Sequence, residues 1–207
     1  MIQRIVDYLN VLYPNPKCEL NYSKDYELLI AVMLSAQATD KGVNKVTDVL
    51  FKKYSTLEEL SKASEENLIE ILKPIGTQQK KARYILSITR ELINNGGKVP
   101  NNREFVESLS GIGHKTTNVV LSNLFDEDCI AVDTHVSRVA IRLGLAKKED
   151  NVLVIEQKLT KKFKGYSLKM LHHQLVLFGR YHCKAKSPEC NDCRLKDMCE
   201  YNKKTKN

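Results

Sequence analysis

The sequence predicts an all-α protein. Apolar residues recur at helical spacing along most of the chain, as in the segment 40–54, where Val43, Val46 and Leu50 fall at positions i, i+3 and i+7. Runs that alternate between apolar and polar residues, which indicate strands, are scarce. The connections between the helical segments are only a few residues long, as in domains built from packed helices.

Several expected helices carry start or stop signals. Thr56 with Glu59 three residues later has the spacing of a capping box, and Ser64 is suited to begin the next helix, which must end before Pro74. Gly96 and the glycine after it form a C-terminal stop. In chain order, the expected helical segments are 1–16, 40–54, 56–63, 64–74, 80–97, 102–113, 114–125, 133–146, 152–163 and 167–183.

Composition and charge narrow the class of protein. The chain has 207 residues, 42% hydrophobic and 28% charged, which suits one large or two small globular domains. The net charge of +8 fits a polyanionic partner, although a merely basic protein has the same balance. Neither a membrane span nor a signal peptide is evident, so we expect an intracellular protein without membrane contact; if the source is a prokaryote, this means the cytoplasm or nucleoid.

Four of the six cysteines crowd into the last quarter of the chain with the spacing C-x6-C-x2-C-x5-C: Cys183, Cys190, Cys193 and Cys199. In a reducing compartment this crowding favours a metal site over disulfides. Four thiolates suit either a tetrahedral zinc ion or a [4Fe–4S] cluster. The lysines in the first gap of the loop, Lys184 and Lys186, are then held against phosphates or form part of a solvated charged surface.

The segment 109–113 reads LSGIG and is followed by an apolar helix. Glycines at 111 and 113 allow a tight turn, and the N–H groups of the turn and of the next helical turn form an anion site. Lys115 stands in the first turn of that helix, where the helix dipole and nearby basic groups favour the uncharged amine. Such an amine is a nucleophile able to form a Schiff base; the alternative is a lysine that contacts phosphate.

Asp133 precedes another expected helix, in the run IAVDTHVSRV. As an N-cap it accepts hydrogen bonds from the next turn. As a functional group it is a carboxylate that takes the proton of the amine or stabilises positive charge on a sugar.

These motifs together resemble endonuclease III, the helix–hairpin–helix DNA glycosylase of base-excision repair. The resemblance rests on LSGIGHKTTNVV, VDTHVSRV, the cysteine spacing and LLIAVMLSAQATD at 28–40, and it spans residues 20–201. It implies two all-α domains with a DNA-binding groove between them: a six-helix domain at 18–127, and a cluster domain formed by 1–17 with 128–207. It also implies a monomer that acts on double-stranded DNA containing oxidised pyrimidines or abasic sites.

The resemblance assigns residues as well. Lys115 falls on the nucleophilic lysine, Asp133 on the catalytic aspartate, and the four cysteines on the ligands of a [4Fe–4S] cluster. We expect DNA contacts from Gln37, Gly111, Gly113, His114, Lys184 and Lys186. Two positions depart from the family pattern: Ser110 replaces the usual proline of the hairpin, and Thr77 stands where a leucine often enters the base stack.

The expected activity is that of a bifunctional glycosylase and AP lyase, which excises the base through a lysine Schiff base and cleaves 3′ to the abasic site by β-elimination. Two alternatives remain open. One is a monofunctional glycosylase of the adenine-mismatch type, which shares the cysteine spacing but lacks the lysine. The other is a non-catalytic DNA-binding module with a structural metal.

Overall fold

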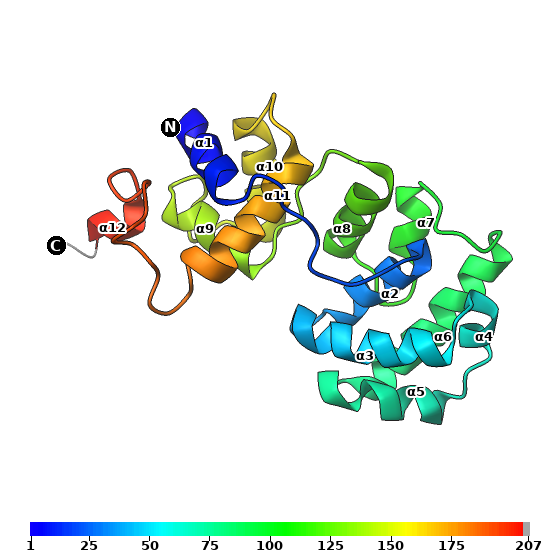
Figure 1. Cartoon of the computed structure of the whole chain (residues 1–207). Helices are drawn as coiled ribbons and strands as arrows, with labels where there is room; N and C mark the ends of the chain where they lie inside the picture. Colours follow the sequence, from blue (N-terminus) through cyan, green and yellow to red (C-terminus); the bar gives the residue numbers. More distant parts are fainter. Residues whose placement is uncertain (205–207) are drawn as a thin grey trace. The chain divides into compact units, whose positions relative to one another are not determined.

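The computed structural model describes residues 1–204, and within that range it contains helices and loops but no strand (Figure 1). The all-α prediction is therefore confirmed. Among the same residues, no helix combines the length and the apolar character needed to span a membrane.

The chain divides into two compact units. The central unit is Cys18–Phe125, and the terminal unit joins Met1–Lys17 to Asp126–Asn207. Both ends of the chain therefore belong to the terminal unit. The domain limits expected from the sequence, 17/18 and 127/128, stay a prediction about functional domains, and the contact-based units change at 17/18 and 125/126.

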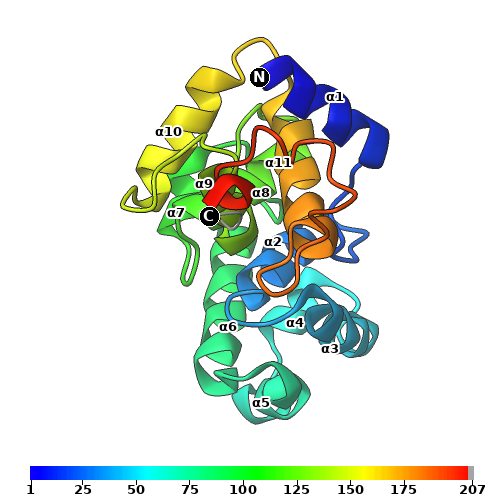
Figure 2. The ribbon, with the colours of Figure 1, turned by 90° about the vertical axis from the view of Figure 1, so that its left-hand side faces the viewer.

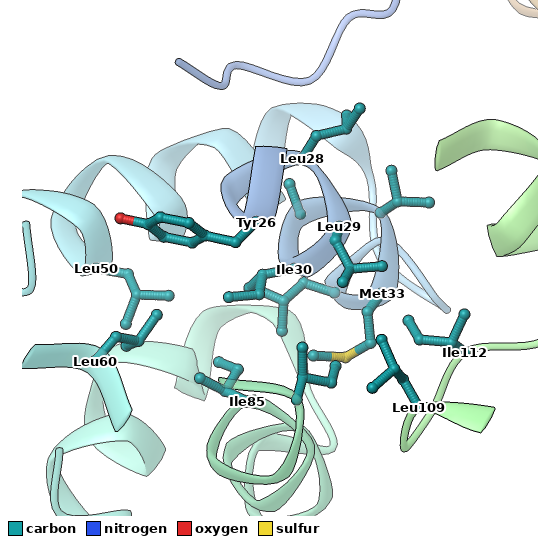
Figure 3. Packing of buried hydrophobic residues seen from close by; sticks show 14 of the residues in the cluster. Tyr26, Leu28, Leu29, Ile30, Met33, Leu50, Leu60, Ile85, Leu109 and Ile112 are labelled. Carbon is teal, nitrogen blue, oxygen red and sulfur yellow. The ribbon is translucent and has the colours of Figure 1, made fainter. Parts of the chain in front are cut away.

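The central unit packs its other helices around one buried helix, α2 (Asp25–Leu34). Every residue from Tyr26 to Leu34 is buried, so this helix is apolar on almost all sides, as a helix in the middle of a core must be. Figure 3 shows its side chains meeting those of the surrounding helices. These are α3 (Asp40–Lys53), α4 (Leu57–Ser61), α5 (Glu65–Leu72), η1 (Lys73–Ile75), α6 (Gln78–Asn94), α7 (Arg103–Ser108) and α8 (His114–Phe125).

The predicted caps explain where these helices begin. Thr56 Oγ1 accepts a hydrogen bond from Glu59 N at 3.1 Å, and Glu59 Oε2 accepts one from Thr56 N at 3.3 Å, so the capping box is confirmed. Ser64 Oγ accepts from Asn67 N at 3.3 Å. The next α-helix ends at Leu72, because Pro74 has no N–H to donate and its ring would clash in a continued α-helix; a short 3-10 turn, Lys73–Ile75, follows.

The terminal unit contains α1 (Ile2–Leu12), α9 (Thr134–Arg142), α10 (Val152–Lys162), α11 (Leu168–Leu177), η2 (Phe178–His182) and α12 (Glu200–Lys204). The apolar face of α1 packs against α11 (Figure 2). The expected single helix over 167–183 is wrong at its end, because the α-helix stops at Leu177 and continues as one π-helical turn. That turn leads directly into Cys183.

Candidate functional site

The hairpin of the central unit is a β-turn whose two ends are buried. Ile112 N donates to Leu109 O at 3.1 Å, and Gly111 has φ +79°, which is the left-handed conformation that a type II turn requires at its third residue. Leu109 and Ile112 belong to the core of the unit, and Figure 3 shows them beside Met33. The core therefore holds both ends of the turn while Gly111 is exposed.

The two glycines of the hairpin have different surroundings. A Cβ at Gly111 would overlap the ring of Tyr84, a residue of α6, whereas a Cβ at Gly113 would meet nothing within 4 Å. Gly111 is thus required both by its backbone conformation and by close packing. Gly113 faces open space, which leaves room for a ligand to approach the backbone.

Helix α8 starts directly after the hairpin, with His114 as its first residue and Lys115 as its second, as predicted. The Lys115 side chain is exposed. His114 Nδ1 lies 3.3 Å from Glu107 Oε1, and its Nε2 lies 3.4 Å from Asn118 Nδ2. Arg103 donates to the same asparagine at 2.8 Å, so polar contacts from α7 and α8 orient the first turn of α8.

Asp133 is the N-cap of α9, the first helix after the central unit in the sequence. Its Oδ1 accepts a hydrogen bond from Val136 N at 2.8 Å, so the capping interpretation is confirmed. The start of α9 is held closely, because a Cβ at Gly179 would lie 2.8 Å from His135 Cβ and because Arg138 donates to Gly179 O at 2.6 Å. Lys115 and Asp133 stand in different units, and their pairing stays a prediction.

Gln37 and Thr77 share an unusual backbone conformation. Gln37 has φ +58° and Thr77 has φ +50°, the left-handed region that non-glycine residues rarely occupy. Such conformations cost free energy and concentrate in loops that bind ligands. The sequence contains no glycine at either position that would have predicted them.

A buried lysine supports the loop before Thr77, and the sequence analysis did not identify it. Lys81 is 4% exposed, and its ammonium donates to Ile75 O at 3.0 Å. Burial lowers the pKa of Lys81. The ammonium thus fastens the end of η1 to α6, directly beside the strained residue.

The four clustered cysteines line one pocket of the terminal unit, together with Arg142 and Phe178. Burial raises the pKa of Cys183 and of Cys193, so these sulfurs stay protonated thiols unless a cation stabilises the thiolates. Within residues 1–204, no three His, Cys, Asp or Glu side chains converge in a way that could hold one metal ion. The donor set of four thiols around a shared pocket nevertheless fits the ligand requirement of an iron–sulfur cluster.

Contacts with α1 and α9 hold the cysteine loop. Arg4 forms a two-pronged pair with Asp197, with Nη1–Oδ2 at 2.7 Å and Nη2–Oδ1 at 2.9 Å, and this hydrogen bonding lowers the pKa of the aspartate. Arg142 donates to Cys183 Sγ at 3.3 Å and to the carbonyl of Lys184 at 2.7 Å. The sequence could not reveal these contacts, because the partners are far apart along the chain.

The two lysines of the cysteine loop, Lys184 and Lys186, differ in their contacts and exposure. Lys184 Nζ pairs with Glu189 Oε1 at 2.8 Å, which offsets its charge, whereas the Lys186 side chain is exposed. Contact of either lysine with phosphate stays a prediction.

Comparisons with known proteins agree with one another. The family model of the HhH-GPD superfamily of base excision DNA repair proteins matches residues 30–165. Endonuclease III of Bacillus subtilis is 42% identical over 98% of this chain and 93% of its own length, and that of Haemophilus influenzae is 45% identical over 92% of this chain and 90% of its own. A solved covalent intermediate of endonuclease III trapped with DNA has a TM-score of 0.94 and 42% identity, covering 100% of this chain and 99% of the other. The chain therefore belongs to the endonuclease III family within the HhH-GPD superfamily.

Proposed function

We propose that this protein is a bifunctional DNA glycosylase and AP lyase, which removes oxidised pyrimidines from duplex DNA and cleaves the strand 3′ to the resulting abasic site. The observation that carries the proposal is an exposed lysine, Lys115, in the first turn of the helix that follows the glycine hairpin. Phosphate held by the N–H groups of this hairpin would lie close to the amine.

The chemistry follows from an amine nucleophile. The damaged nucleotide is turned out of the duplex, and the unprotonated Lys115 amine attacks C1′ as the bond to the base breaks. Asp133 takes the proton of the amine or offsets the positive charge on the sugar. Opening of the sugar ring gives a Schiff base, loss of a C2′ proton then expels the 3′ phosphate, and water hydrolyses the imine to restore the amine.

The remaining site residues contact DNA in this proposal. Gln37 occupies the space left by the extruded base, and Thr77 lies at the opposite strand. The amides of Gly111 and Gly113 bind phosphate, as does His114. Lys184 and Lys186 contribute further phosphate contacts from the cysteine loop. The protein would act as a monomer inside the cell, in the cytoplasm or nucleoid if the source is a prokaryote.

Cys183, Cys190, Cys193 and Cys199 would hold a [4Fe–4S] cluster. The family relationship supports this assignment over zinc, because four thiolates by themselves suit either centre. When bound, the cluster cross-links a loop that has few large apolar residues of its own, and thereby stabilises it. The placement of Lys115 in α8 and the capping of α9 by Asp133 depend on the polypeptide and not on the cluster.

A cleavage assay tests the proposed function. Duplexes that contain thymine glycol or an abasic site should be cut, and borohydride should trap a covalent protein–DNA adduct, while an undamaged duplex should give neither product. Removal of adenine from a mismatch without a trapped adduct would favour the monofunctional alternative. Binding without any cleavage would leave only the DNA-binding module.

The purified protein should be brown and contain iron and inorganic sulfide in equal amounts. The physical reason is that four thiolates from one short loop satisfy all ligand positions of the cluster. Metal analysis with a sulfide assay is the measurement. A colourless protein with stoichiometric zinc would overturn the cluster assignment.

Affinity for duplex DNA should fall steeply as salt concentration rises, because phosphate contacts release bound counterions. About five phosphate contacts would give a slope of about −4.5 in a plot of log K against log salt concentration. Fluorescence anisotropy with a labelled duplex measures the slope. A nearly flat plot would contradict a binding surface built from amides and lysines.

A further inference from the structure

We propose that Ser87 and Tyr84 of α6 are positioning residues for the hairpin, and that they hold the turn 109–112 in the conformation that binds DNA. This inference rests on the proposed function, because it concerns the affinity of the hairpin for phosphate.

The first contact is a pair of hydroxyl groups. Ser87 Oγ and Ser110 Oγ are 2.9 Å apart and share a hydrogen bond between α6 and the turn. Ser110 is the second residue of the turn, where a proline would restrict φ by its ring. A serine has no such restriction, so an external contact is needed to keep the turn in one conformation.

The second contact lies one helical turn earlier on the same face of α6. The ring of Tyr84 packs over Gly111, so closely that a Cβ there would overlap it. The Lys80 ammonium lies 5.5 Å from the centre of this ring and adds a cation–π contact. Tyr84 and Ser87 are three residues apart, a spacing that places both side chains on one side of the helix. Two neighbouring turn residues, Ser110 and Gly111, are thus each contacted from α6.

Different contacts hold the ends and the middle of the turn. Leu109 and Ile112 anchor its ends in the core, whereas Ser87 contacts Ser110 and Tyr84 contacts Gly111 between them. The middle carries the amide of Gly111, one of the two amides expected to meet phosphate. Restraining that amide before DNA arrives reduces the entropy lost on binding. Removing the restraint should therefore weaken binding more than it slows chemistry in the bound complex.

The test measures two quantities for the variants Ser87→Ala, Ser110→Ala and the double variant. One is the Kd for a duplex that carries an uncleavable abasic-site analogue, and the other is the single-turnover cleavage rate at saturating enzyme. Each single variant should raise Kd about fivefold, the effect of losing one neutral hydrogen bond. The double variant should be no weaker than either single variant, since both remove the same bond. The saturated rate should change less than about twofold, because the restraint acts on binding.

A proline substitution at position 110 provides a rescue. Leu109 already has φ −69° and ψ 144°, the conformation favoured before proline, and within residues 1–204 the Ser110 N–H donates no hydrogen bond. Ser110→Pro should therefore bind at least as tightly as the wild type, and Ser87→Ala should have no effect in that background. Ser87→Thr keeps the hydroxyl and should retain most of the affinity.

Ser61→Ala is the matched control, because among the described residues the Ser61 hydroxyl bonds only to Glu58 O, in the same helix, α4. Its Kd should equal that of the wild type, and the other serine variants should melt within a few degrees of it, the shift expected from one lost hydrogen bond. The inference is overturned if the wild type binds and cleaves damaged DNA while Ser87→Ala binds equally well, if the effects of Ser87→Ala and Ser110→Ala multiply, or if Ser87→Ala remains harmful in the Ser110→Pro background. A wild type that neither binds nor cleaves damaged DNA would overturn the proposed function itself, together with this inference.

Discussion

Lys115→Ala is expected to eliminate the borohydride-trapped adduct and to reduce strand cleavage by about a thousandfold or more, the scale on which loss of a covalent nucleophile acts. The structure places this lysine exposed in the first turn of α8, so its removal leaves the core intact. The melting temperature should therefore match that of the wild type. Single-turnover cleavage of an abasic duplex, with and without borohydride, measures the effect.

Two further variants distinguish the nucleophilic role of Lys115 from the effect of its positive charge. Lys115→Arg keeps a positive charge that can contact phosphate but lacks a nucleophilic amine, so it should bind DNA within a few-fold of the wild type and fail to form the adduct. Lys45→Ala removes an exposed charge from α3 and should form the adduct normally. Efficient trapping by Lys115→Ala would mean that another amine is the nucleophile.

Gly111→Ala is expected to destabilise the protein by about 2 kcal/mol or more. The left-handed backbone alone costs an L-residue about 1–2 kcal/mol, and the new methyl group must also displace the ring of Tyr84. Because the turn would move and its amides would no longer be held for phosphate, DNA affinity should fall as well, by about tenfold or more. Urea denaturation and anisotropy measure the two effects.

Gly113→Ala is the control for the folding effect. Its Cβ would meet nothing within 4 Å, and no left-handed backbone is involved, so its free energy of unfolding should differ little from that of the wild type. Gly111→Ala with wild-type stability and affinity would show that the turn adopts another conformation.

The local features of the fold were predictable because their signals lie within a few residues of sequence. Thr56 and Glu59 cap a helix across one turn. Pro74 ends another because it has no N–H to donate. The end of α11 was not predictable in this way. The apolar pattern continues past Leu177, and the change to a π-helical turn accompanies the close approach of Gly179 to His135, a residue far away in sequence.

In the candidate site, too, the features with local sequence signals were predictable and those set by distant contacts were not. Lys115 after the hairpin and Asp133 as an N-cap follow from short motifs. The Tyr84 ring on Gly111 and the pair of Arg4 with Asp197 depend on which helices pack together, and a single sequence gives no signal for such pairs. The left-handed backbones of Gln37 and Thr77 were likewise hidden, because surrounding contacts impose them on residues that do not favour them.

The most direct measurement of the central claim is the identity of the residue attached to DNA in the wild-type adduct. The protein is trapped on an abasic duplex with borohydride and digested, and the modified peptide is sequenced by mass spectrometry. We expect the sugar fragment on the side-chain nitrogen of Lys115. A fragment on the amino group of Met1 or on any other lysine would contradict the account.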